Sequence, residues 1–213
     1  MTKRLKIIAS HIGKGNVFAD IGCDHGLISE YVLKNHLFDK VIASDISDKS
    51  LDKAKKLLSK YESKVTFIVS DGFSNFDTVP DEAVIAGMGG EEICSILTSA
   101  VALPEKLILS PQKNQRKVRE LLIRKNYKIF DDYTVFDKKF YDIIVARKGS
   151  DFYNEVELEF GRTNLKLRPN DFILKLKFEE EKVLNIINAN GVSENEELQN
   201  YLQKIRKILN EDK

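Results

Sequence analysis

Short apolar runs alternate with amphipathic segments along the first two thirds of the chain. Each run is continuous, as in a strand buried inside a parallel sheet, and the segments between the runs carry apolar residues at helical spacing. This alternation is typical of an α/β fold. The predicted strands cover residues 17–21, 40–45, 65–69, 82–90 (with its terminal turn) and 106–110, and the predicted helices cover residues 4–12, 27–36, 49–61, 91–100 and 113–125.

Two later segments show a different pattern, in which apolar and polar residues alternate one by one. Residues 127–136 and 140–147 follow this pattern and are joined by Asp137-Lys138-Lys139, which predicts an antiparallel hairpin. We expect the hairpin to complete a seven-stranded, Rossmann-like sheet with the strand order 3-2-1-4-5-7-6.

The pattern changes again after Gly149. Residues 152–160 are irregular or partly helical, a helix is predicted from Pro169 to Ala189, Gly191 ends it, and Ser193-x-x-Glu196 is a capping box for a last helix through Leu209. Apolar residues predict that these helices form an antiparallel, coiled-coil-like pair; they are Leu176, Val183, Ile186 and Ile187 facing Leu198, Leu202, Ile205 and Leu209. We therefore divide the chain into residues 1–150 and 151–213. The second part is either a hairpin that stabilises the first or an arm that grips a large substrate.

Composition changes this picture little. The net charge is +1, although residues 151–213 contain 13 acidic and 10 basic residues, so the excess of positive charge lies in the first part. Cys23 and Cys94 are far apart in sequence, which favours reduced thiols in a cytoplasmic protein over a disulfide or a metal site. We find no 18-residue apolar stretch and no signal-peptide pattern, and we expect no membrane span.

The turn after the first strand carries the first candidate chemistry, in the pattern Asp20-x-Gly-x-Asp-x-Gly26. A strand, a glycine turn and a helix start present bare backbone N–H groups to a ligand. Asp20 and Asp24 would repel a pyrophosphate but attract the ammonium and sulfonium of S-adenosylmethionine. The alternative is a generic strand–turn–helix corner. His25, inside the turn, either contacts the cofactor or caps the helix.

Two more acids follow the next two strands. Asp45 lies 25 residues beyond Asp20, where an acid accepts both ribose hydroxyls of a nucleoside cofactor. Alternatively it caps the next helix, although Ser47 and Asp48 compete for that role. Asp71, between Ser70 and Gly72, is placed to accept from the exocyclic amine of adenine, or else is a routine turn residue.

The fourth strand ends in Gly87-Met88-Gly89-Gly90, at the point where the strand order reverses and ligands bind. Met88 either borders the transferred methyl group or is ordinary packing. The Asn/Asp-Pro-Pro-Tyr/Phe motif of amino-methylating enzymes is absent, which argues against an exocyclic amine as the acceptor. The candidate cofactor-binding residues are Asp20, Gly22, Cys23, Asp24, His25, Gly26, Asp45, Ile46, Ser70, Asp71, Gly72, Gly87, Met88 and Gly89.

Residues after the fifth strand and in the hairpin are predicted to border the acceptor, on the other side of the same crevice. Gln112 and Asn114, after the fifth strand, either hydrogen-bond a base edge or cap the next helix. Tyr141 either stacks on a base or packs in the sheet. We take Met88, Gln112 and Tyr141 as the catalytic candidates.

Basic residues gather in two places. One helix carries Lys113, Arg116, Lys117, Arg119, Arg124 and Lys125 against one acid, Glu120, and a second group precedes the C-terminal helices. The helix is either a phosphate-binding surface or a solvated face, and the second group lies at the root of the C-terminal part, which either stabilises the first or grips a large substrate. The candidate RNA-binding residues are Arg4, Lys113, Arg116, Lys117, Arg162, Lys166 and Arg168.

Several motifs together resemble the TrmK family of bacterial tRNA (adenine-N1)-methyltransferases. They are Phe18-Ala-Asp-Ile-Gly-Cys-Asp-His-Gly26, Ala43-Ser-Asp45, Ser70-Asp-Gly72, Ile85-Ala-Gly-Met-Gly-Gly90 and Glu157-Leu-Glu-Phe-Gly161. The resemblance implies a class I methyltransferase domain, S-adenosylmethionine as the methyl donor, the adenine at tRNA position 22 as the acceptor and a coiled-coil-like C-terminal domain that helps to hold tRNA. One departure is Ser110-Pro-Gln-Lys-Asn114, where the family pattern is Gln-Pro-Asn.

We expect a monomer that binds tRNA and S-adenosylmethionine without a metal ion. Two other functions are compatible with the fold. One is methyl transfer to a small-molecule acceptor, against which the basic helix and the helical arm argue. The other is a non-catalytic RNA-binding module, against which the three acids at strand ends argue.

Overall fold

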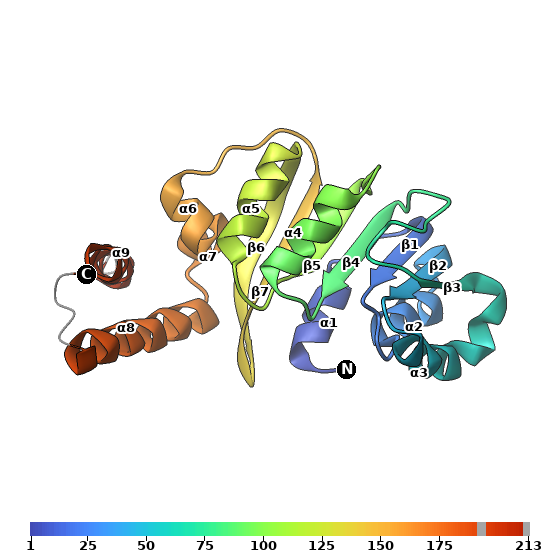
Figure 1. The fold of residues 1–213 in the computed structure, drawn as a ribbon, viewed down its shortest axis with the longest axis horizontal. Helices are drawn as coiled ribbons and strands as arrows, with labels where there is room; N and C mark the ends of the chain where they lie inside the picture. Colours follow the sequence, from blue (N-terminus) through green and yellow to red (C-terminus); the bar gives the residue numbers. More distant parts are fainter. Residues whose placement is uncertain (191–194, 211–213) are drawn as a thin grey trace.

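The computed structural model describes residues 1–190 and 195–210, which form an α/β fold around one seven-stranded sheet (Figure 1). The strand order is β3-β2-β1-β4-β5-β7-β6, which confirms the predicted order. The first five strands are parallel, and β7 runs antiparallel to both of its neighbours. The strands are β1 (Gly15–Ile21), β2 (Phe38–Asp45), β3 (Val65–Val69), β4 (Glu82–Ala86), β5 (Lys106–Ser110), β6 (Tyr127–Asp137) and β7 (Lys139–Lys148).

Helices cover both faces of the sheet because its central strands are apolar on both sides. One face packs on α1 (Lys3–Ser10), α2 (Leu27–Lys34) and α3 (Asp48–Leu58), through a core that includes Ile8, Val32 and Leu51. The other packs on α4 (Gly90–Ser99) and α5 (Gln115–Arg124), through a core that includes Ile93, Leu97 and Leu122. Burial of these side chains is the main stabilising contribution to the fold.

Several predicted helix ends differ from the observed ones by a few residues, among them the end predicted at residue 12, which lies at Ser10. The α-helix predicted over 49–61 ends at Leu58, and the chain continues as a 3₁₀ segment, η1 (Ser59–Lys64), in which Tyr61 has non-helical backbone angles. The helix predicted to reach His36 ends at Lys34, because His36 takes a positive φ of 51° that no α-helix accommodates.

Four helices follow the sheet, namely α6 (Glu155–Phe160), α7 (Arg162–Leu167), α8 (Asn170–Asn190) and α9 (Glu196–Asn210). They lie beyond the β6 edge of the sheet, at the end of the molecule opposite β3 (Figure 1). Phe172, Leu176, Ile205 and Ile208 form the apolar contact between α8 and α9. Gly191 and the start of the predicted capping box at Ser193 lie outside the described residues.

The predicted coiled-coil-like pairing of the last two helices is not confirmed. In Figure 1, α8 runs across the view while α9 is seen nearly end-on, so the two helices cross instead of lying side by side over their whole length. Hydrogen bonds from Tyr201 to Glu179 and from Arg206 to Glu180 fix this crossing. The division into domains 1–150 and 151–213 stays a prediction. Within the described residues, no helix is long and apolar enough to cross a membrane.

A buried ion cluster joins the C-terminal helices to the sheet. Arg119 of α5 has no exposed side-chain surface and donates to Asp132 of β6 at 3.2 Å and to Asp142 of β7 at 2.8 Å. Asp142 also accepts from Lys175 of α8 at 3.1 Å. Although burial opposes ionisation, Lys175 and Arg119 hold the pKa of Asp142 at about 2. The expectation that Arg119 belongs to a phosphate-binding surface is therefore wrong, because water cannot reach its guanidinium.

Substitution of Arg119 should destabilise the protein strongly. Arg119→Met leaves Asp132 and Asp142 buried with less compensating positive charge, and loss of one partner from a buried pair costs about 3–5 kcal/mol. Urea unfolding followed by circular dichroism at pH 7 measures the change. Lys117→Met, on the exposed face of the same helix, is the matched control and should leave the midpoint unchanged. Equal midpoints for the two variants would contradict the structural role given to Arg119.

Candidate active site

A cavity of about 740 Å³ lies at the carboxyl ends of the parallel strands. Its size is typical of a small-molecule or cofactor site. Twelve of the fourteen cofactor-binding residues predicted from the sequence line it, namely Asp20, Gly22, Cys23, Asp24, His25, Asp45, Ile46, Ser70, Asp71, Gly72, Gly87 and Met88.

The two other predicted residues, Gly26 and Gly89, lie outside the cavity lining and contact residues behind it. Gly26 begins α2 with a φ of 71°, and a Cβ there would lie 3.1 Å from the Cβ of Ala54 in α3. The Gly89 backbone N–H donates to the Glu92 carboxylate at 2.7 Å. Glycine at position 26 therefore permits the turn and the close packing of α2 on α3.

Asp20 is a buried carboxylate without a cationic partner among the described residues. Its side chain accepts two hydrogen bonds, from the Ser29 backbone N–H at 3.1 Å and from the Ser29 hydroxyl at 2.7 Å. Burial raises the pKa of Asp20 to about 6, and the bonds from Ser29 offset only part of this shift. A ligand cation at this point would compensate the buried charge.

Asp24 is held differently from its neighbour in the motif. Its exposed carboxylate pairs with Lys53 of α3 at 2.9 Å and with His25 Nδ1 at 2.5 Å. The hydrogen bond from Lys53 is the main cause of the lowered pKa of Asp24. Asp24 also adopts a φ of 42°, which lets the turn close. Because this charge is already compensated, Asp20 is the better candidate to attract a cation.

The acids at the next two strand ends face the cavity from β2 and β3. Asp45 accepts from the Ser47 backbone N–H at 2.9 Å through Oδ1, while its Oδ2 has no hydrogen-bond partner among the described residues. The side chain of Asp71 is exposed and also lacks such a partner there. Gly72 has a φ of 64°, and a Cβ at this position would lie 2.5 Å from Ile96 of α4. The geometry therefore keeps both carboxylates available to a ligand.

Two loops form the wall between β4 and β5. The Gly90 N–H donates to the Lys113 carbonyl at 2.9 Å, and the Gln112 N–H donates to the Met88 carbonyl at 3.0 Å. A Cβ on Gly90 would lie 2.6 Å from the carbonyl oxygens of Lys113 and Asn114. Only glycine permits this approach, which fixes the position of the Gln112 loop beside Met88.

The predicted acceptor residues lie together next to this wall. The side-chain amide of Gln112 donates to the Gly87 carbonyl at 2.5 Å and accepts from Lys139 at 3.1 Å. The ring of Tyr141 lies between two cations, 4.5 Å from the Arg4 guanidinium carbon and 5.1 Å from the Lys139 ammonium. Gln112 is thus a bridge between the loops, and the Tyr141 ring is already in contact with cations.

The chain has a matching family model and close structural relatives. A model described as a methyltransferase domain matches residues 1–144. The tRNA (adenine(22)-N(1))-methyltransferase of Bacillus subtilis is 33% identical over 156 residues, which are 70% of this chain and 66% of that protein. The crystal structure of B. subtilis TrmK has a TM-score of 0.83 at 26% identity, covering 98% of this chain and 95% of that one.

The chain belongs to the TrmK family of methyltransferases. The structure of M. capricolum TrmK in complex with S-adenosylhomocysteine has a TM-score of 0.88 at 27% identity and covers 98% of this chain and 97% of that chain. These matches confirm the resemblance stated from the sequence motifs, and the two structural matches, which cover 98% of the chain, extend over the C-terminal helices.

Some residues that line the cavity of this TrmK-family chain are missing from the sequence-based prediction. Glu92, Ser95 and Ile96 come from α4, and their i, i+3, i+4 spacing after the glycine turn is the signal that could have found them. Arg4, predicted for RNA, lines the cavity instead, with its Nη1 buried and lacking a hydrogen-bond partner. No sequence signal places α1 beside this edge of the sheet.

Most of the basic residues predicted to contact RNA are engaged by protein groups. Arg116 pairs with Glu120, Glu155 and Glu159, and Lys117 pairs with Glu91. The other contacts are those of Arg162 with Asp151 and Glu157 and of Arg168 with the Ile208 carbonyl. Lys113 and Lys166 are exposed and form no ion pair within the described ranges. The RNA contacts of all these residues stay predictions.

The buried charge of Asp20 should make stability depend on pH in the absence of ligand. The folded-state pKa of about 6 lies above the unfolded value near 4, so the folded state binds more protons between these values. The contribution of Asp20 to the free energy of unfolding therefore falls as pH rises from about 4 to about 6, and it stays low above pH 6. As pH rises from 4.5 to 7.5, the free energy of unfolding of Asp20→Asn should increase by roughly 1–3 kcal/mol relative to that of wild type, measured by urea unfolding. A difference that is the same at both pH values would contradict the buried, unpaired state of Asp20.

Proposed function

We propose that this protein transfers a methyl group from S-adenosylmethionine to N1 of the adenine at position 22 of tRNA, giving 1-methyladenosine. The observation that carries the proposal is the cavity with Asp20, Asp45 and Asp71 at three successive strand ends, in a chain of the TrmK family. A B. subtilis relative is named for this reaction, and the M. capricolum relative binds S-adenosylhomocysteine. A carboxylate that lacks a cation suits a ligand with an ammonium group better than one with a pyrophosphate.

The residues of the cavity fit the cofactor from one end to the other. Asp20 would hold the ammonium group, because this carboxylate is buried and lacks a cation among the described residues. The free Oδ2 of Asp45 would accept from the ribose hydroxyls, and Asp71 would accept from the adenine amine. Gly72 lets the backbone approach the ring. When bound, S-adenosylmethionine supplies an electrophilic methyl group.

The acceptor needs no general base. Adenine N1 carries a lone pair in the neutral ring, so no residue has to remove a proton before methyl transfer. The contribution of the chain is then to position the base, which makes the reaction effectively unimolecular. We assign this positioning to Met88, Gln112 and Tyr141, since the paired loops fix Gln112 beside Met88, and Tyr141 lies next to Lys139. Methyl transfer moves the positive charge from the sulfonium to the adenine ring, and a carboxylate near the ring would stabilise the charge there.

The proposal also covers the oligomeric state of the protein and its location in the cell. We expect it to act as a monomer on tRNA in the cytoplasm, without a metal ion. Of the described residues, no group of three or more His, Cys, Asp or Glu side chains is arranged to hold a metal.

Incubation with unmodified tRNA transcripts and methyl-labelled S-adenosylmethionine tests the proposal, with mass spectrometry of the digested nucleosides as the readout. We expect labelled 1-methyladenosine, and its loss when adenine 22 is replaced by guanine. Asp45→Ala is the matched variant and should weaken cofactor binding at least tenfold, because a ribose partner is lost. Label in small molecules but in no RNA would show that the acceptor is a small molecule. Binding of the cofactor without any label transfer would show that the protein is a non-catalytic module.

A further inference from the structure

Three phenylalanine rings, two of them exposed and Phe140 half-buried between them, form a strip between the sheet and the C-terminal helices. Phe136 of β6 and Phe140 of β7 have ring centroids 5.0 Å apart, and Phe140 lies 6.2 Å from Phe178 of α8. Phe178 is 59% exposed and Phe136 is 40% exposed. Leu174, one helical turn before Phe178, is 50% exposed. We call Phe136, Phe140 and Phe178 the aromatic strip.

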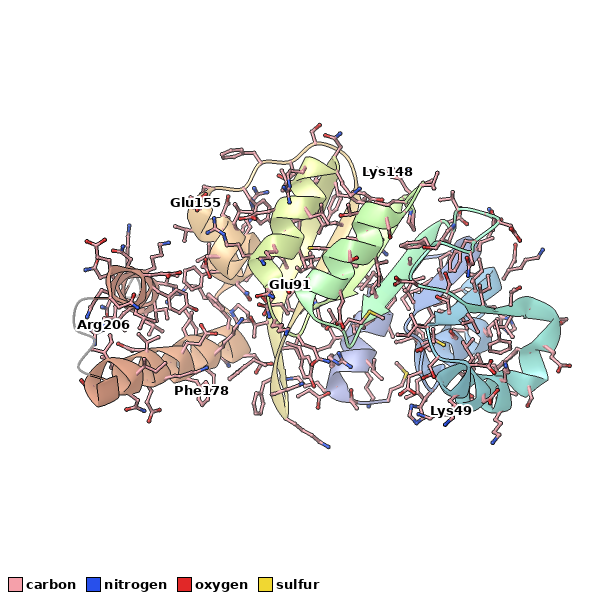
Figure 2. The ribbon with its side chains drawn as sticks, viewed as in Figure 1. Lys49, Glu91, Lys148, Glu155, Phe178 and Arg206 are labelled. Atoms are coloured by element: carbon pink, nitrogen blue, oxygen red, sulfur yellow. The ribbon has the colours of Figure 1, made fainter. Side chains whose placement is uncertain are left out.

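The exposure of the aromatic strip has no explanation within the described fold. Its rings touch one another but do not belong to any of the buried apolar cores. Contiguous exposed apolar side chains on a protein surface mark an interaction site more often than single ones do. Figure 2 shows Phe178 projecting from α8 on the side of the molecule where the β6–β7 hairpin ends.

Three lysines surround the aromatic strip, and one exposed acid, Glu181 of α8, lies among them. Lys138 and Lys139 form the hairpin turn between Phe136 and Phe140, and Lys182 follows Phe178 by one helical turn. Within residues 1–190 and 195–210, none of these three lysines forms an ion pair. The nearby acids Asp137 and Asp171 are already engaged, by the Arg4 backbone N–H and by Lys3. The basic residues Arg116 and Lys117 of α5, in contrast, are neutralised by carboxylates.

The aromatic strip is carried in part by the hairpin whose Tyr141 lies near the cavity. Phe140 precedes Tyr141, whose ring lies against Arg4, and Arg4 lines the cavity. Lys139 reaches Gln112 in the wall beside Met88. Phe178 continues the strip onto α8, which the contact between Lys175 and Asp142 holds in place. Because successive side chains of a strand point to opposite faces, Phe140 lies on the face of β7 opposite Tyr141, and RNA held at the cavity would extend past the hairpin turn to reach the strip.

We infer that the aromatic strip binds unpaired nucleotides of the RNA substrate, with bases stacked on Phe136 and Phe178 and phosphates beside Lys138 and Lys182. This inference rests on the proposed function and specifies where the RNA is held. Aromatic side chains flanked by lysines are the usual way in which proteins bind single-stranded nucleotides, because every base has a π face.

The affinity for an unmodified tRNA transcript, measured by fluorescence anisotropy at fixed salt, tests the inference. Phe178→Ala and Phe136→Ala should each raise the Kd about tenfold, as expected for the loss of one stacked base. Phe178→Tyr should stay within about threefold of wild type, whereas Phe178→Leu should resemble Phe178→Ala, because leucine keeps the apolar surface but cannot stack. The affinity for S-adenosylmethionine should not change in any of these variants.

Phe152→Ala is the matched control, since Phe152 is 76% exposed and lies before α6, away from the aromatic strip. It should leave the tRNA Kd unchanged. An unchanged Kd in Phe178→Ala, or full rescue by leucine, would overturn the inference. So would a wild-type dimer, seen by sedimentation velocity, that becomes a monomer in Phe178→Ala without loss of tRNA affinity, because the strip would then bind a second copy.

The methylation assay separates this inference from the proposed function. If wild type forms 1-methyladenosine and Phe178→Ala does so with an unchanged KM for tRNA, the inference fails while the function stands. If wild type methylates no RNA, the proposed function fails whatever the strip does. We expect the KM for tRNA to rise with the Kd in Phe178→Ala.

Discussion

The buried guanidinium of Arg119 is the contact on which the arrangement of the molecule depends. It joins α5 to both strands of the β6–β7 hairpin through Asp132 and Asp142, and Lys175 extends the same cluster to α8. The hairpin carries Tyr141 beside the cavity and Phe140 beside Phe178. Because these charges are compensated only when all of the elements are in place, the cluster also specifies how the C-terminal helices meet the sheet.

The active site combines two kinds of local structure. The carboxyl ends of β1, β2 and β3 bring three carboxylates to one edge of a parallel sheet, where their spacing suits a nucleoside with an ammonium group. The wall beside them is made by two loops that approach closely because Gly90 has no side chain. We propose that the carboxylates recognise the cofactor and that the paired loops fix the residues that border the acceptor. Neither feature requires a general base, in agreement with an acceptor nitrogen that has a free lone pair.

The sheet and most of the cavity could be predicted from the sequence because their signals are local. Apolar runs mark the strands, and the acids directly after them must lie at one edge of the sheet, so Asp20, Asp45 and Asp71 could be placed together. The roles of the basic residues could not be predicted in this way. Arg119 finds its acids 13 and 23 residues away, on a hairpin whose packing depends on tertiary structure. Arg4 and the crossing of α8 with α9 likewise depend on contacts between distant segments.

A crystal structure of the protein with S-adenosylhomocysteine is the most direct test of the account. We expect the ammonium group of the ligand within about 4 Å of Asp20, at ion-pair distance, its ribose hydroxyls on Asp45 and its adenine amine facing Asp71. The thioether sulfur should then lie beside Met88, at the wall that borders the acceptor. A ligand that lies elsewhere, or one that leaves Asp20 in contact with Ser29 alone, would contradict the assignment of the cavity.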